Sequence, residues 1–136
     1  MMKKALATTL AATMLLGTAG MVAGAEEKSV EGMTVAFIPK VTGNAFFESA
    51  NDGAQEFAEK WGITVEYMGN SVAGAAEQVE VIHQAINTGV DAICISTVDA
   101  AGVADALKEA ADMGITVCTW DSDANAEDRA LMVSQG

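Results

Sequence analysis

Residues 34–47 have the sequence TVAFIPKVTGNAFF, and this stretch decides the fold class of the chain. It begins with a short apolar run, Val35–Ile38, which Pro39 interrupts. A polar turn that ends at Asn44 follows, and two aromatic residues then open a long helical pattern. This order predicts a buried strand, a polar loop and a helix, which together form the first half of a βαβ unit. In open α/β sheets, loops of this kind carry ligands.

The same pattern repeats along the chain. Apolar strand-like runs begin near Thr34 (TVAFI), Ile63 (ITVEYM), Asp91 (DAICIS) and Ile115 (ITVCTW). Their starts are 29, 28 and 24 residues apart, and each gap holds one helical segment. Strands that alternate with helices of this length form a parallel sheet with right-handed crossovers. We therefore predict an α/β fold of the Rossmann-like or flavodoxin-like type, with helices on both faces of a parallel sheet.

Three helices are predicted, over residues 44–61, 73–88 and 100–113. Each carries an apolar stripe at helical spacing. The stripes consist of Phe47, Ala50, Ala54, Phe57, Ala58 and Trp61 in the first helix, Val79, Ile82 and Ile86 in the second, and Val103, Ala106, Leu107 and Ala110 in the third. A glycine follows each helix, as expected of a C-terminal stop; these are Gly62, Gly89 and Gly114.

The first 25 residues have the features of a cleavable signal peptide. Lys3 and Lys4 form a basic start, a run of small apolar residues follows, and Ala23-Gly24-Ala25 matches the A-x-A pattern of a cleavage site. A retained membrane anchor is the weaker alternative, because the run contains Thr and Gly. We predict an exported protein, periplasmic or extracellular, that is not inserted in a membrane after cleavage. A short linker over residues 26–32 would then precede the domain.

Charge and cysteine content narrow the function classes further. Without Lys3 and Lys4, five Lys and Arg remain against nineteen Asp and Glu, a net charge near −14. This balance argues against nucleic acid and anionic membranes as partners. Cys94 and Cys118 are the only two cysteines. Both lie in apolar strand-like runs, which predicts free, buried thiols, although export keeps a disulfide open as an alternative.

The last part of the chain predicts an incomplete domain. A polar stretch, Asp121–Arg129, is followed by a short apolar run, Ala130–Val133, and then by the end of the sequence at Gly136. A parallel sheet needs cover on both faces, and no helix follows this last strand-like run. We therefore expect residues 33–136 to be one lobe of a larger domain.

The carboxyl ends of the predicted strands meet at one edge of the sheet, where ligands bind in this architecture. The residues at this edge are polar, and they are Lys40–Asn44, Gly69–Ser71, Ser96–Asp99 and Asp121–Asp123. Such an edge suits reversible binding of a polyol. A carboxylate such as Asp121 accepts hydrogen bonds from two adjacent hydroxyls. Lys40 can donate to a ring oxygen, carbonyl or hydroxyl, and Phe46 or Phe47 can cover the C–H face of a sugar ring.

Each candidate also has a structural interpretation. Asn44 and Asp99 are good N-caps, Phe47 belongs to the core stripe, and Lys40 can be a solvated surface cation. Asp121 and Asp123 resemble the start of a calcium loop, but no glycine or closing glutamate follows at the required spacing. We therefore predict no metal.

The sequence offers little for catalysis. His83, the only histidine, lies on the second predicted helix, where we expect a partly buried surface residue. The strand ends offer no nucleophile with an adjacent base. No G-x-G-x-x-G or G-x-x-x-x-G-K-[ST] motif is present, so nucleotide binding is disfavoured. We predict that the protein is not an enzyme and uses no cofactor.

Two blocks of sequence resemble a known family. FIPKVTGNAFFESANDGAQEFAEKWGI and GVDAICISTVDAAGVADALKEAADMGITVCTWDSD are similar to the first lobe of periplasmic sugar-binding proteins of the ribose type. The pair FIPK and TWDSD is similar to the branch that binds autoinducer-2 or rhamnose as the receptor of an ABC importer. The resemblance covers residues 33–136. It implies a two-lobed type I periplasmic binding protein whose chain crosses to the second lobe near residues 133–136.

The resemblance also assigns residues. Lys40 and Asp121 match first-lobe ligand contacts of the autoinducer-2 branch, while Asn44, Phe46 and Phe47 match the N-x-F-F contacts of ribose-type members. The sequence departs from the ribose pattern at two positions, with Ala45 in place of proline and Ser122 in place of arginine. These departures argue against ordinary ribose or galactose as the ligand.

The resemblance implies a monomer with a small sugar-like ligand and a membrane permease as partners. Half of the ligand contacts would lie in the second lobe, so residues 1–136 alone are not expected to bind with native affinity. Four alternatives remain: a receptor for another pentose or hexose, a chemoreceptor ligand-binding protein, a secreted flavodoxin-like enzyme, and the sensing core of a transcription repressor. The signal peptide, the acidity and the missing helix-turn-helix argue against the last.

Overall fold

The computed structural model describes residues 29–134. The predicted signal peptide and the first residues of the linker lie outside this range. Four strands and three helices alternate, and a short 3-10 helix and a fifth strand complete the chain. In order these are β1 Thr34–Ile38, α1 Ala45–Trp61, β2 Thr64–Tyr67, α2 Ala75–Thr88, β3 Ala92–Ile95, α3 Ala100–Asp112, β4 Thr116–Trp120, η1 Ala126–Asp128 and β5 Leu131–Val133.

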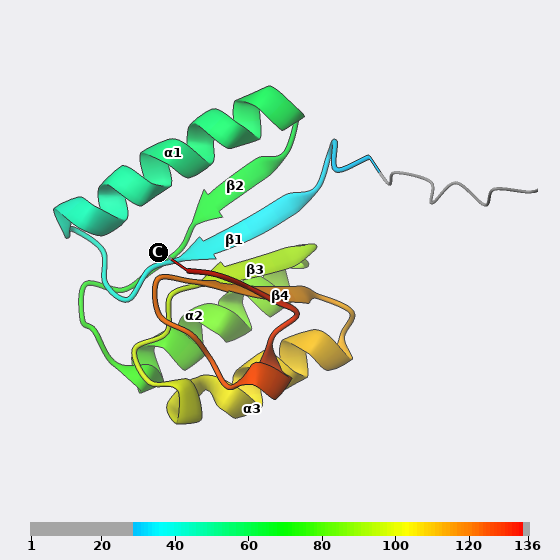
Figure 1. The fold of residues 1–136 in the computed structure, drawn as a ribbon. Coiled ribbons are helices and arrows are strands. Elements are labelled where there is room, and N and C mark those ends of the chain that lie inside the picture. The colour runs from blue at the N-terminus through cyan, green and yellow to red at the C-terminus, as the bar shows by residue number, and fades with distance from the viewer. Residues whose placement is uncertain (1–28, 135–136) are drawn as a thin grey trace, which may run out of the picture.

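The five strands form one parallel sheet in the order β2-β1-β3-β4-β5. Figure 1 shows α1 on one face of this sheet and both α2 and α3 on the other. The predicted α/β fold with helices on both faces is confirmed. The chain runs outward from β1 to β2 and then crosses back to β3 on the other side of β1. The strand order therefore reverses between β1 and β3, which is where ligands bind in open sheets of this kind.

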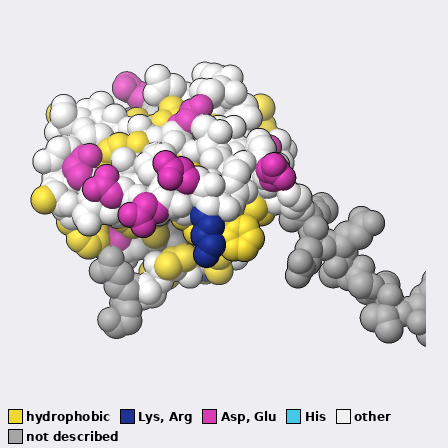
Figure 2. Space-filling model, turned by 90° about the horizontal axis from the view of Figure 1, so that it is seen from above, with side chains coloured by type: hydrophobic (Ala, Val, Ile, Leu, Met, Phe, Trp, Pro, Cys, Tyr) yellow, Lys and Arg dark blue, Asp and Glu magenta, His cyan; other side chains and the backbone are white. Residues whose placement is uncertain are grey.

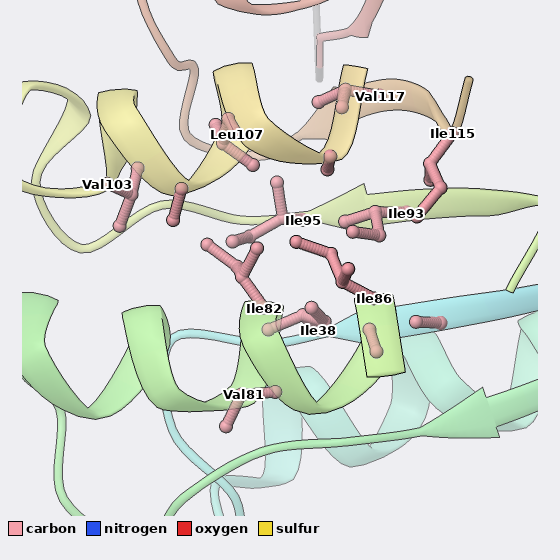
Figure 3. Close-up of a cluster of buried hydrophobic side chains, with 14 of the residues drawn as sticks. Ile38, Val81, Ile82, Ile86, Ile93, Ile95, Val103, Leu107, Ile115 and Val117 are labelled. Carbon is pink, nitrogen blue, oxygen red and sulfur yellow. The ribbon is translucent and has the colours of Figure 1, made fainter. Parts of the chain in front are cut away.

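Most of the core lies between the sheet and the helices α2 and α3. Ile38, Ile93 and Ile95 from the strands meet Ile82 and Leu107 from the helices, and all five side chains are fully buried (Figure 3). Burying each such aliphatic side chain contributes about 1.5–3 kcal/mol. The apolar stripes predicted for the second and third helices are confirmed, because their residues are buried or packed against this cluster.

The stripe predicted for the first helix is only partly buried. Phe47 and Ala58 are buried, but Phe57 is 53% exposed and Trp61 is 49% exposed. The reason is that α1 covers β2 and leaves part of the neighbouring sheet face open. Figure 2 shows acidic side chains over the α1 face, with hydrophobic side chains between them. An apolar groove of about 280 Å³ lies there, lined by Val30, Met33, Val35, Phe57, Trp61 and Ile63.

The helix ends follow the sequence signals. Asn44 and Asp99 cap α1 and α3, and each side chain accepts a hydrogen bond from a backbone N–H two residues on. Gly62 and Gly89 are left-handed C-caps of α1 and α2, a conformation that glycine adopts without strain. Of the helices in residues 29–134, none is long and apolar enough to cross a membrane.

Cys94 and Cys118 are free and are direct register partners on β3 and β4. Both side chains are half-buried, so the prediction of free thiols is confirmed and that of full burial is not. His83 is exposed and lies 3.2 Å from Glu109 of α3. The expected partial burial of His83 is therefore wrong: its side chain lies on the surface and its Nε2 is within hydrogen-bond distance of Glu109, so the contact bridges α2 and α3.

Candidate functional site

The loop after β1 is fixed at several points. Its first residue, Pro39, is fully buried. Further along, the Thr42 N–H donates to the Asn70 carbonyl over 2.9 Å, and the Gly43 N–H donates to Glu48 Oε1 over 2.9 Å. Together with the Asn44 cap, these bonds tie the loop both to α1 and to the segment after β2. Lys40 is therefore presented from a loop with little freedom.

Glu48 has a second partner on β2. The Tyr67 hydroxyl donates to Glu48 Oε1 over 3.0 Å. Burial, and then the hydrogen bond to Glu48 and its charge, raise the pKa of Tyr67 to about 12. Tyr67 therefore stays neutral across the physiological pH range, and its hydroxyl donates the hydrogen bond to Glu48 throughout. The first turn of α1 is thereby joined to the carboxyl end of β2.

Lys40 and Asp121 meet at the edge of the sheet. Lys40 Nζ lies 3.5 Å from Asp121 Oδ2, and the two side chains are 33% and 24% exposed. Ser96, at the end of β3, donates its hydroxyl to the same Oδ2 over 2.8 Å. No donor in residues 29–134 contacts the other oxygen, Oδ1. The three residues come from the ends of β1, β3 and β4, and they form a row across the switch point.

Asp121 has an unusual backbone conformation. Its φ angle is 60°, and it is the one non-glycine residue in the described range with a positive φ. Holding such a residue in the left-handed region costs about 1–3 kcal/mol, and strain of this kind concentrates at functional sites. The conformation is held by a bond from the Asp121 N–H to the Val133 carbonyl over 3.3 Å. The carboxylate is thus directed by its backbone as well as by Ser96.

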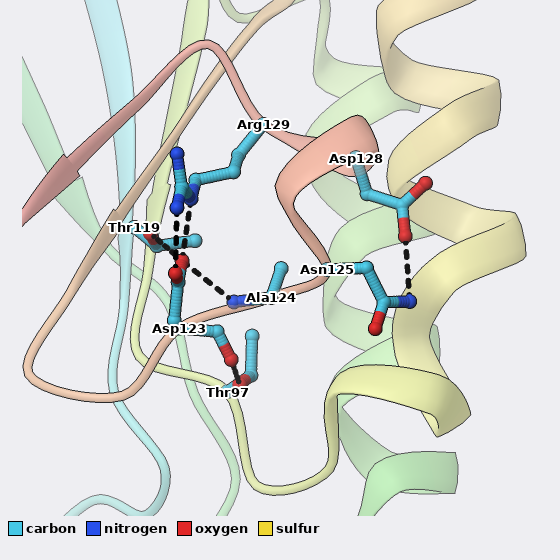
Figure 4. Close-up of polar contacts among 7 residues, drawn as sticks. All are labelled: Thr97, Thr119, Asp123, Ala124, Asn125, Asp128 and Arg129. Carbon is cyan, nitrogen blue, oxygen red and sulfur yellow. Dashed lines mark hydrogen bonds and ion pairs between the residues drawn. The ribbon is translucent and has the colours of Figure 1, made fainter.

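Asp123 is held by a separate network (Figure 4). Arg129 Nε donates to Oδ1 over 2.6 Å and Arg129 Nη2 donates to Oδ2 over 2.7 Å, while the Thr119 hydroxyl and the Ala124 N–H also donate to Oδ1. The hydrogen bonds from Arg129 and Thr119 lower the pKa of Asp123 to about 2. Both oxygens already have partners, so this carboxylate shapes the β4–β5 loop. Its role as a ligand contact stays a prediction.

Aromatic side chains line the same edge. Trp120 stacks on Phe37 with 4.5 Å between ring centroids, and its indole N–H donates to the Cys94 carbonyl over 3.3 Å. Phe47 meets Trp120 edge to face at 5.8 Å and is only 7% exposed, whereas Phe46 is 44% exposed. Phe46 is therefore the aromatic residue of this pair that is presented to solvent, and Phe47 supports it from the core.

Two structural features of this edge escaped the sequence analysis. Trp120 was assigned only to a strand, although its position directly before Asp121 places it at the same edge. Gln78 is 3% exposed on α2 and hydrogen-bonds to the ends of β1 and β3. The available signal was its spacing, four residues before Ile82 and eight before Ile86, which places an amide in line with the apolar stripe of the second helix.

The fold is an open α/β sheet whose polar edge lies at a switch point, the place where ligands bind in this architecture. The chain belongs to the family of the periplasmic binding protein domain, whose model matches residues 35–136. This agrees with the family resemblance found in the sequence.

Solved structures extend this result. The chain is 62% identical to LsrB from Clostridium saccharobutylicum in complex with AI-2, with a TM-score of 0.76, over 76% of this chain and 32% of that one. It is 33% identical to an ABC transporter solute binding protein from Clostridium phytofermentas with bound L-rhamnose, with a TM-score of 0.72, over 77% and 33% of the two chains.

A curated relative points the same way. The D-ribose/D-allose-binding protein of Pseudomonas aeruginosa is 29% identical over 91 residues, which is 65% of this chain and 28% of that protein. The chain therefore spans about a third of the length of the relatives it matches.

Proposed function

We propose that the intact protein is an exported receptor that reversibly binds a small sugar-like ligand between two lobes and delivers it to the permease of an ABC importer. The ligand is of the autoinducer-2 or rhamnose type. The observation that carries this proposal is the Lys40–Asp121 pair, 3.5 Å apart at the switch point of the sheet. The similarity to an AI-2 complex at 62% identity supports the choice of ligand.

The chemistry of the edge suits a small polyol. Asp121 Oδ1 accepts hydrogen bonds from ligand hydroxyls, and Lys40 donates to a ring, carbonyl or hydroxyl oxygen; charge-assisted bonds of this kind are the stronger ones. Phe46 covers the C–H face of the ligand, and the Asn44 amide donates beside it. The predicted set of contacts also includes Phe47 and Asp123. Phe47 packs against Phe46 and supports it, and Asp123 stabilises the loop that carries Asp121.

Binding works through lobe closure. The ligand contacts both lobes and stabilises the closed arrangement. The shift from the open to the closed arrangement depends on how much more tightly the ligand binds the closed one. In this proposal residues 1–25 are a signal peptide, residues 26–32 a linker and residues 33–136 the first lobe. The receptor is a monomer outside the cytoplasm and is not an enzyme.

The second candidate is a receptor for another pentose or hexose. The similarity to an ABC transporter solute binding protein from Burkholderia graminis in complex with D-arabinose, at 34% identity, favours this alternative. Ordinary ribose and galactose are disfavoured, because Ala45 and Ser122 replace the residues of those groups. A chemoreceptor role would use the same site with a different membrane partner.

Thermal unfolding of the intact protein tests the proposal. Autoinducer-2, L-rhamnose, D-ribose and D-galactose are each added in excess. A ligand at 100 times its Kd stabilises the folded state by about 2.7 kcal/mol, so a clear rise in Tm is expected with autoinducer-2 or L-rhamnose. The absence of a rise with any sugar-like ligand would refute the receptor function.

A further inference from the structure

Gln78 is a buried amide at the switch point of the sheet. It lies in the first turn of α2 and is 3% exposed. Its Nε2 group donates to the Pro39 carbonyl over 3.1 Å and to the Ser96 carbonyl over 2.8 Å, while its Oε1 accepts from the Val98 N–H over 2.8 Å. One side chain therefore bonds to both of the loops that leave β1 and β3.

The need for this amide follows from the topology. The last hydrogen bond between the two strands in this region runs from the Ser96 N–H to the Ile38 carbonyl, over 2.9 Å. Beyond it the chain after β1 turns to α1 and the chain after β3 turns to α3, on opposite faces of the sheet. Backbone groups just past the split lose their strand partners, and buried groups without partners are costly. Gln78 satisfies three of them.

Few side chains can replace it. The amide carries two N–H donors and one carbonyl acceptor, whereas an ionised glutamate only accepts and methionine offers no N–H or O–H donor. The partners of Gln78 are next to the candidate ligand contacts. Pro39 directly precedes Lys40, and Ser96 donates its hydroxyl to Asp121.

We propose that Gln78 is a positioning residue that sets the separation of Lys40 and Asp121 by holding the Pro39 and Ser96 carbonyls and the Val98 N–H together. It acts from α2 through the backbone of the two loops and touches no ligand. This inference rests on the proposed function for its effect on binding, while its effect on the two loops is independent of any ligand.

The test compares Gln78→Met with Ile86→Ala in the intact protein. Ile86 lies on the same helix eight residues after Gln78, is 6% exposed and belongs to the core cluster, so its truncation should lower stability and leave the bonds of Gln78 in place. Two readouts are used at a temperature where all variants are folded. The first is ligand-free amide hydrogen exchange, and the second is the Kd for autoinducer-2 or L-rhamnose.

Gln78→Met should speed exchange of the Val98 amide at least tenfold more than that of the core amides and should weaken binding about tenfold. Ile86→Ala should affect amides without preference for Val98 and leave the Kd within twofold. A Gln78→Met variant that matches Ile86→Ala in both readouts overturns the positioning role. Wild-type protein that binds neither ligand refutes the proposed ligand type instead, and the exchange readout then decides the role of Gln78 by itself.

Discussion

Gly69 controls how closely the segment after β2 approaches the loop that carries Lys40. A Cβ atom added at Gly69 would lie 2.7 Å from Thr42 Cγ2 and 3.0 and 3.2 Å from two ring carbons of Pro39, whereas ordinary contacts are 3.4–4 Å. Thr42 can turn away from the new methyl group. Pro39 cannot, because its ring is rigid and fully buried and its carbonyl accepts a hydrogen bond from Gln78.

The expected cost of Gly69→Ala follows from these distances. Forcing an extra methyl group into such contacts costs about 1–3 kcal/mol, and the lower entropy of the unfolded chain returns about 0.4–1 kcal/mol. We therefore expect a net loss of about 1.3 kcal/mol in the free energy of unfolding, which is the difference between the middle values of these two ranges. Because the strain falls on Pro39, Lys40 should shift away from Asp121, and affinity for the ligand should fall about tenfold, which corresponds to about 1.4 kcal/mol.

Gly53→Ala is the matched control. Gly53 lies inside α1, and a Cβ atom there would meet nothing within 4 Å. Alanine in a helix interior is about 0.5–1 kcal/mol better than glycine, so this variant should gain stability and keep its affinity. Denaturant unfolding and calorimetric titration of the intact protein measure both quantities. If Gly69→Ala proves as stable and as tight a binder as Gly53→Ala, the inferred close approach is wrong.

Two further predictions concern the titratable groups Asp123 and Cys94. The pKa of Asp123 is lowered in the folded state from 3.8 to about 2, so its contribution to stability is present above pH 3.8 and is lost as the pH falls towards 2. Arg129→Met should flatten this part of the curve of stability against pH. An unchanged curve would contradict the hydrogen-bond network around Asp123. Burial, and then the neighbouring Cys118, raise the pKa of the Cys94 thiol to about 12. Iodoacetamide at pH 8 should therefore label Cys94 far more slowly in the folded than in the unfolded protein. Equal labelling rates would show that the fold does not protect this thiol.

The sequence predicted the framework well because periodicity determines it. Alternating apolar runs and helical stripes fixed the parallel sheet, and the Asn44 and Asp99 caps followed from local chemistry. The meeting of Lys40 and Asp121, which are 81 positions apart in the sequence, could be expected from the rule that strand ends share an edge. The intervening strand β3 supplies Ser96 between them, which only the strand order makes visible.

Other features depend on three-dimensional neighbours that no local pattern encodes. The bonds of Gln78 arise because two backbone loops separate at the switch point, and its sequence context shows only an amide in line with an apolar stripe. Asp123 was predicted from its place at a strand end, but the partner that occupies it, Arg129, comes from the following loop. The exposure of Phe57 and Trp61 depends on what covers the sheet beside α1, so the helical stripe alone could not predict it.

The proposed receptor function depends most on the Lys40–Asp121 pair as a ligand-binding site. Calorimetric titration of the intact protein with autoinducer-2 or L-rhamnose tests this pair most directly. Lys40→Met and Asp121→Asn should each weaken binding at least tenfold, which is about 1.4 kcal/mol. Lys108→Met is the matched control, because Lys108 forms a 2.8 Å ion pair with Asp112 on the exposed side of α3. We expect its Kd to stay within twofold of the wild-type value. Wild-type affinity in both Lys40→Met and Asp121→Asn would contradict the account.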